Sequence, residues 1–145
     1  MVHGGPLKFA WTIIGLLTLV TASSSAVSGI KVIAHASVKV SQVTPDEIKG
    51  VFLGTRTSLA DGSHVEPVLL KSGDVHDTFV KLYTGKTVVG LESYYRSLVF
   101  TGKGSMPKVL TSDAEMVAYV KNTRGAIGYV SAGTNTDGVK ILDVK

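Results

Sequence analysis

Residues 112–130 constrain the fold more than any other part of the chain, because they combine a helix start, a helix end and a buried strand. Ser112 and Glu115 have the spacing of a capping box, in which each side chain accepts a hydrogen bond from the other residue's amide. Apolar side chains follow at helical spacing, and Gly125 stands where a left-handed residue ends a helix. Residues 126–130 are typical of a short buried strand, in which Gly128 indicates close approach of a neighbouring element. A helix that leads through a glycine turn into a buried strand predicts an α/β fold.

Strands and helices alternate through the rest of the chain. Strands are expected at residues 30–35, 65–70 and 139–144, and helices at residues 45–53, after residue 74 and at residues 87–99. Thr44 and Glu47 form a second capping box, with Pro45 at the first helical position. Pro67 indicates that its strand lies at a sheet edge or starts irregularly. The sequence shows no internal repeat and no second domain, so we expect one α/β domain.

Helical spacing also predicts which side chains are buried. The helix that ends at Gly85 is expected to bury Val75, Phe79, Leu82 and Tyr83. Three further aromatic residues are expected to belong to the core, namely Tyr94, Tyr95 and Phe100.

The first 26 residues have the order of a secretory signal peptide. Lys8 precedes an apolar run at residues 9–20, and small residues follow up to Ala26. This run is shorter than the roughly 20 residues needed to span a bilayer. We therefore expect cleavage after Ala26, or after Ala22, and a mature domain at residues 27–145 in the periplasm or outside the cell. The chain has no cysteine, which excludes a lipid anchor at the cleavage site and any disulfide.

The formal net charge is +4, and the basic residues are scattered along the chain. No basic run or aromatic-interleaved patch occurs, so nucleic acid is not expected as a partner. A weakly positive surface is compatible with an anionic ligand or with plain solubility.

Three motifs occur in the same order as in a known family. Residues 44–54 (TPDEIKGVFLG), 98–104 (LVFTGKG) and 125–130 (GAIGYV) resemble segments of phosphate ABC transporter substrate-binding proteins and their short periplasmic relatives. The resemblance runs over nearly all of residues 27–145. It implies a single lobe of the type II periplasmic-binding-protein fold, a mixed sheet flanked by helices. It also implies binding rather than catalysis, no cofactor, and an ABC transporter or another envelope protein as partner.

The resemblance places a candidate anion site at residues 71–74. The family holds phosphate at a helix start with an R-x-x-x-S-G-T loop; Ser72 and Gly73 match it, but Asp74 replaces the threonine and Lys71 only approximates the missing arginine. We expect Lys71 and the amides of residues 72–74, helped by Lys103, to hold a small oxyanion such as phosphate weakly. Two simpler interpretations stay open: Ser72 or Asp74 caps the helix, and residues 101–104 form an ordinary helix end.

A second hypothesis is an interaction module that kept the fold without the ligand. Such a module would dock on an envelope partner or on a second copy of itself, and an exposed apolar patch would favour it. The sequence shows no catalytic constellation and no recognised metal-ligand spacing, so neither an enzyme nor a metal site is expected. Asp74, His76 and Asp77 are close in sequence, but we expect them to be solvated on a helix surface.

Overall fold

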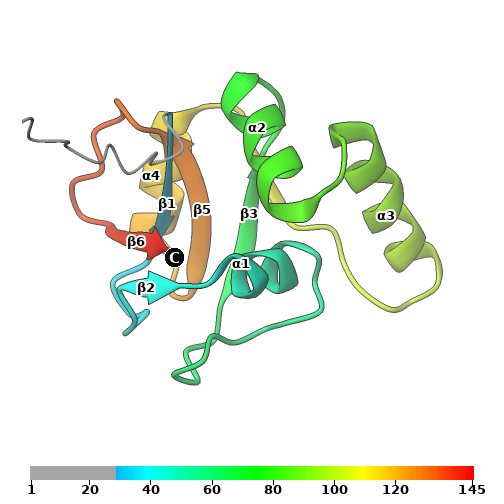
Figure 1. Cartoon of the computed structure of the whole chain (residues 1–145), viewed down its shortest axis with the longest axis horizontal. Helices are drawn as coiled ribbons and strands as arrows, with labels where there is room; N and C mark the ends of the chain where they lie inside the picture. Colours follow the sequence, from blue (N-terminus) through cyan, green and yellow to red (C-terminus); the bar gives the residue numbers. More distant parts are fainter. Residues whose placement is uncertain (1–28) are drawn as a thin grey trace, which may run out of the picture.

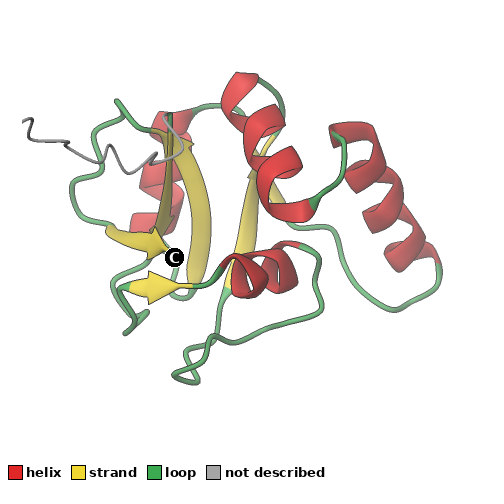
Figure 2. Ribbon diagram, in the orientation of Figure 1, coloured by secondary structure: helices red, strands yellow, loops and turns green. Residues whose placement is uncertain are grey.

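A six-stranded sheet runs through residues 29–145, which are the residues that this computed structural model describes (Figure 1). The predicted signal peptide, residues 1–26, lies outside them. The strands are β1 (Ile30–Ala34), β2 (Gln42–Val43), β3 (Glu66–Leu70), β4 (Lys108–Leu110), β5 (Ala126–Ser131) and β6 (Lys140–Val144). The helices are α1 (Pro45–Phe52), α2 (Asp74–Phe79), which continues as the π-helix η1 (Val80–Thr84), α3 (Val88–Phe100) and α4 (Asp113–Asn122) (Figure 2).

The sheet is mixed, with the strand order β2-β6-β1-β5-β3-β4. β3 runs parallel to both β4 and β5, and helices provide the long connections that parallel strands need. β1 is antiparallel to its neighbours β5 and β6, and the short β2 pairs with β6 at the edge. The predicted mixed α/β sheet flanked by helices is confirmed.

Two neighbouring residues of β5 show how the helices cover the sheet. Gly128 and Tyr129 face opposite sides of the strand, because side chains alternate along it. A Cβ atom at Gly128 would lie 2.5 Å from Sδ of Met116 in α4, so any larger residue would force the Met116 side chain to move, and glycine allows the close approach that the sequence predicts. The Tyr129 ring stacks on Phe79 of α2 at 3.7 Å between centroids. Helix α4 therefore lies on one face of the sheet and α2 on the other.

The two predicted capping boxes differ in the structure. At α1 the amide of Glu47 donates to Thr44 Oγ1 over 3.1 Å, and the amide of Thr44 donates to Glu47 Oε2 over 2.9 Å, so this box is confirmed. At α4 the Glu115 amide donates to Ser112 Oγ over 3.1 Å, but the Glu115 carboxylate accepts from the amide and hydroxyl of Thr111. Only half of the second box is therefore formed.

Pro67 lies in an inner strand, so its predicted edge position is wrong and the irregular start is right. The amide of Glu66 donates to Gly125 of the chain segment that leads into β5, whereas the amide of Lys71 donates to Leu110 of β4. Amides alternate between the two neighbours, so the nitrogen of Pro67 faces the β4 side. Pairing with β4 starts only at Val68, and the missing N–H therefore breaks no hydrogen bond of the sheet.

The buried face of α2 differs from the predicted one. His76 is only 4% exposed, which corrects the expectation that it is solvated, and Leu82 is 46% exposed, which corrects its place in the core. For Leu82 the cause is η1, since a π-helical turn shifts the residues that face the core, whereas His76 precedes η1 and shares a helix face with Phe79. Phe79 and Thr84, five positions apart, are both buried.

Helix α3 docks on the end of α1 through two tyrosines. The Tyr94 hydroxyl donates to the carbonyl oxygen of Leu53 over 2.6 Å, and the Tyr95 hydroxyl donates to that of Phe52. Tyr95 is buried and Tyr94 half-buried, as predicted, but Phe100 at the end of α3 is 91% exposed and does not belong to the core. No helix within residues 29–145 is both long enough and apolar enough to cross a membrane.

Candidate ligand site

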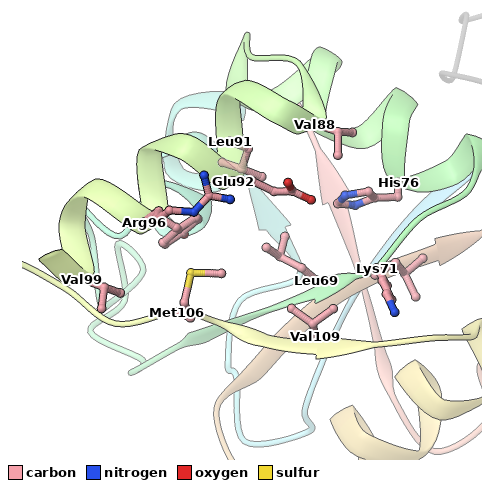
Figure 3. A pocket seen from close by; sticks show the side chains of 12 residues that line it. Leu69, Lys71, His76, Val88, Leu91, Glu92, Arg96, Val99, Met106 and Val109 are labelled. Atoms are coloured by element: carbon pink, nitrogen blue, oxygen red, sulfur yellow. The ribbon is translucent and has the colours of Figure 1, made fainter.

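A pocket of about 380 Å³ lies where β3 ends, between α2, α3 and β4 (Figure 3). This volume is in the range of small-molecule sites, and the carboxyl ends of parallel strands are where α/β sheets bind ligands. Figure 3 shows His76, Glu92 and Arg96 on the helices, Leu69 and Val109 on the strands, and Lys71 at the end of β3. The polar residues around it are Lys71, His76, Glu92 and Arg96, and the apolar residues include Leu69, Leu91, Val99, Met106 and Val109.

The buried His76 is held in one orientation by Tyr129 of β5. Nδ1 of His76 lies 2.5 Å from the Tyr129 hydroxyl, which also accepts a hydrogen bond from the amide of Leu70 over 3.0 Å. The Leu70 amide can only donate, so among the described residues the hydroxyl proton has no acceptor other than Nδ1 of His76, and we assign the hydroxyl as the donor and Nδ1 as the acceptor. The ring proton of neutral His76 is then on Nε2, for which no hydrogen-bond partner occurs among the described residues.

Burial favours this neutral form. It lowers the pKa of His76, and the opposing effects of the nearby Asp77 and Glu92 carboxylates are smaller. Burial also raises the pKa of Tyr129, which therefore keeps its proton. At neutral pH the pocket thus contains a fixed N–H donor whose partner must come from a bound molecule or water.

Charged side chains come to the pocket from two elements. Lys71 directly follows β3, whereas Glu92 and Arg96 lie one turn apart on α3. The ion pairs found within residues 29–145 join Arg56 to Glu47 and His64 to Glu66, and none involves these three pocket residues. Their charges are therefore not paired with each other.

The predicted anion site at residues 71–74 is open to solvent. Lys71, Ser72, Gly73 and Asp74 are all exposed. Gly73 is the N-cap of α2, with φ at 109°, and no side chain caps this helix. The simpler interpretation, in which Ser72 or Asp74 caps the helix, is therefore wrong. The Lys71 amide already donates a hydrogen bond to the carbonyl oxygen of Leu110. Only the amides of the residues after Lys71 therefore remain as candidates for binding an anion.

Lys103 lies in the turn after α3 and does not line the same pocket as Lys71. It borders a second pocket together with Arg56 and Lys108. The amide of Lys103 donates to Leu98 over 2.9 Å, and the amide of Gly102 donates to Val99 over 3.1 Å. These bonds are those of an ordinary helix end, which was the simpler interpretation of residues 101–104.

Sequence reasoning missed His76, Glu92 and Arg96 as residues of this pocket, and Tyr129 as the buried partner of His76. A signal for His76 was present, because it lies three positions before Phe79 and so on the same helix face. The partnership of His76 with Tyr129 joins positions 53 residues apart, which no local pattern indicates.

Comparisons with known proteins bear on the fold. No family model and no curated protein matches the chain. Among solved structures, a protein from Clostridium perfringens, assigned as a phosphate ABC transporter substrate-binding protein and carrying bound phosphate, has a TM-score of 0.62 at 21% identity. An ABC-type phosphate transport receptor from Vibrio cholerae has a TM-score of 0.54 at 16% sequence identity, and PstS from Borrelia burgdorferi has a TM-score of 0.58 at 16% sequence identity.

These matches cover 80–81% of this chain but only 44–47% of the other three, so the chain spans about half their length. The fold is that of one lobe of a phosphate-type substrate-binding protein. This confirms the fold that the sequence resemblance implied. The similar proteins are transport receptors and substrate-binding proteins rather than enzymes.

Proposed function

We propose that this chain is an exported solute-binding protein that holds a small oxyanion such as phosphate weakly, at residues 71–74. The observation that carries the proposal is the open start of α2, where Lys71, Ser72 and Gly73 are exposed and no side chain caps the helix. Unpaired amides near a positive side chain attract anions. The bound phosphate of the Clostridium perfringens protein, whose fold is similar, supports the same ligand class.

Weak binding follows from the exposure of these residues. Solvent competes for each contact when a ligand is not enclosed, and this chain covers less than half of the similar proteins. The carboxylate of Asp74 lies next to the proposed anion and repels it. We expect a dissociation constant on the order of 1 mM, which corresponds to about 4 kcal/mol of binding free energy.

Export and partnership belong to the same proposal. Residues 1–26 would direct the chain out of the cytoplasm and be removed, leaving residues 27–145 in the periplasm or outside the cell. The partner would be an ABC transporter or another envelope protein.

Calorimetric titration of the purified protein with phosphate and with sulfate tests the binding. Lys71→Ala and Ser72→Ala should abolish a saturable signal that the original chain gives. Lys49→Ala removes another exposed lysine, from α1, and should leave the signal unchanged. A signal that all three variants retain would show that phosphate binds elsewhere.

A second candidate function, the interaction module, is favoured by an exposed apolar patch. Val99, Phe100, Met106 and Val109 are 41–91% exposed, and three of them also line the pocket. Exposed apolar residues of this kind mark interaction surfaces. Sedimentation should then show a dimer that Phe100→Ser dissociates; a monomer at every concentration would leave only a different partner protein for this hypothesis.

A further inference from the structure

We propose that the pocket between β3, α2, α3 and β4 binds a small organic anion. Its apolar body would lie against Leu69, Leu91 and Met106, with a carboxylate or phosphoryl head group near His76 and Arg96. The inference goes beyond the proposed oxyanion binding at residues 71–74, because inorganic phosphate has no apolar part and would leave most of this pocket unfilled.

The apolar body follows from the walls of the pocket. Leu69 and Leu91 are buried, whereas Val99, Met106 and Val109 are 41–51% exposed around the opening. Covering these side chains with an apolar group removes their surface from water, which is favourable in proportion to the area. A pocket of about 380 Å³ accommodates a ligand of several carbon atoms.

The negatively charged head group is inferred from the hydrogen-bond donors of His76 and Arg96. His76 is nine-tenths buried, and its Nε2–H faces the pocket without a partner among the described residues. Arg96 is exposed and can only donate hydrogen bonds, so both groups can donate to an acceptor that enters the pocket. A head group with negatively charged oxygens provides acceptors for both of them.

Glu92 does not reverse this preference. Figure 3 shows its carboxylate between the His76 ring and the Arg96 guanidinium. Arg96, one turn further along α3, offsets the charge of Glu92, and Lys71 adds a second positive charge. The residues that line the pocket carry two cations and one carboxylate beside a neutral imidazole, so the lining is positive by one charge and favours an anion over a neutral molecule of the same shape. The Asp77 carboxylate acts on His76 from outside this lining and reduces the preference.

Amide NMR titrations with hexanoate, hexanol and inorganic phosphate test the inference on the purified protein. Hexanoate should shift the Leu69, Leu91 and Val109 amides in a saturable way and bind about tenfold more tightly than hexanol, since one charge-assisted hydrogen bond is worth at least this factor. Arg96→Gln should bring hexanoate down to the affinity of hexanol. Equal affinities for the two ligands in the original chain would overturn the anionic head group.

A second set of variants tests the apolar wall of the pocket. Val99→Gln together with Met106→Gln should weaken the binding of both hexanoate and hexanol. Val89→Gln changes a more exposed valine of α3 outside the pocket and should have no effect. Absence of saturable shifts with either ligand would overturn the whole inference. So would a stable dimer, seen by sedimentation, that covers the pocket and excludes hexanoate.

The oxyanion site at residues 71–74 and the organic-anion pocket can be refuted independently of each other. Phosphate binding that depends on Ser72, without hexanoate binding, would refute only the organic-anion pocket. Hexanoate binding that Ser72→Ala leaves intact, without any phosphate binding, would support the pocket and refute the proposed function.

Discussion

The starts of α1 and α2 are fixed in place by opposite means. At α1, Thr44 and Glu47 cap the helix across three positions, and the Glu47 carboxylate also accepts from the amide of Ala60 and pairs with Arg56 at 3.3 Å. At α2 no side chain caps the helix, and the element is anchored by His76 on Tyr129, which lies 53 positions away.

The difference shows how one fold provides both stability and an accessible site. A capped helix start has used its amides and is closed to ligands. Because α2 is held from its buried side, its first amides remain open at the surface beside Lys71. We therefore expect substitutions at the α1 start to change stability, and substitutions at the exposed α2 start to change binding.

The largest effect is expected from removing the anchor of α2. Tyr129→Phe leaves two buried groups, the Leu70 amide and His76 Nδ1, without a partner, and should lower the free energy of unfolding by about 3 kcal/mol. Denaturant titration measures this. Tyr94→Phe is the control, because its half-buried hydroxyl has one partner and should cost about 1 kcal/mol. Equal losses for the two variants would show that Tyr129 does not anchor α2.

A smaller loss is expected at the start of α1. Glu47→Ala removes the acceptor for the Thr44 and Ala60 amides. Both of these residues are exposed, so hydrogen bonds to water compensate for part of the lost stability. We expect about 2 kcal/mol in the same denaturant titration. Asp46→Ala, at a neighbouring exposed position, should change the stability by less than about 0.5 kcal/mol.

The anchor of α2 should also make stability depend on pH. Burial lowers the pKa of His76 in the folded chain, so the unfolded chain binds the proton more readily. The free energy of unfolding should therefore fall as the pH drops below the ordinary histidine value of 6.5, and this contribution is fully present above that pH. Unfolding measured at pH 7.5 and pH 5.5 tests this, and His76→Gln should reduce the difference. If the difference in stability between the two pH values is unchanged in His76→Gln, another titratable group causes it.

The exposed residues of the α2 start should affect binding without affecting folding. Asp74→Thr removes the carboxylate beside the proposed anion and should tighten phosphate binding about threefold, given that exposed charge interactions are worth up to about 1 kcal/mol. Calorimetry measures the affinity.

The smallest expected effect is on stability at the same place. Ser72→Ala removes an exposed hydroxyl that caps no helix, so the free energy of unfolding should change by less than about 0.5 kcal/mol. A loss above 1 kcal/mol would mean that Ser72 supports the fold, and the comparison between the two helix starts would not hold.

Several parts of the fold were predictable because they depend on neighbours in sequence. The Thr44–Glu47 box and the buried strand around Gly128 are local patterns. Gly125 is left-handed, but the prediction that it ends the helix is wrong, because α4 ends at Asn122 with the extended Thr123 as its C-cap. The motifs at residues 44–54, 98–104 and 125–130 then indicated a lobe whose fold the solved structures confirm. The candidate site was only partly predictable: the exposed segment at residues 71–74 was indicated, but the adjacent pocket was not.

The sequence alone determined the four α-helices and four of the six strands, since short-range spacing and turn residues specify these, and the resemblance to a known family indicated the mixed sheet. Tertiary structure decided the burial of His76, the solvent exposure of Phe100 and the meeting of His76 with Glu92 and Arg96 in one pocket. The physical reason is that a π-helical turn and a hydrogen bond between α2 and β5 set which side chains face each other, and both depend on packing between segments far apart in the chain.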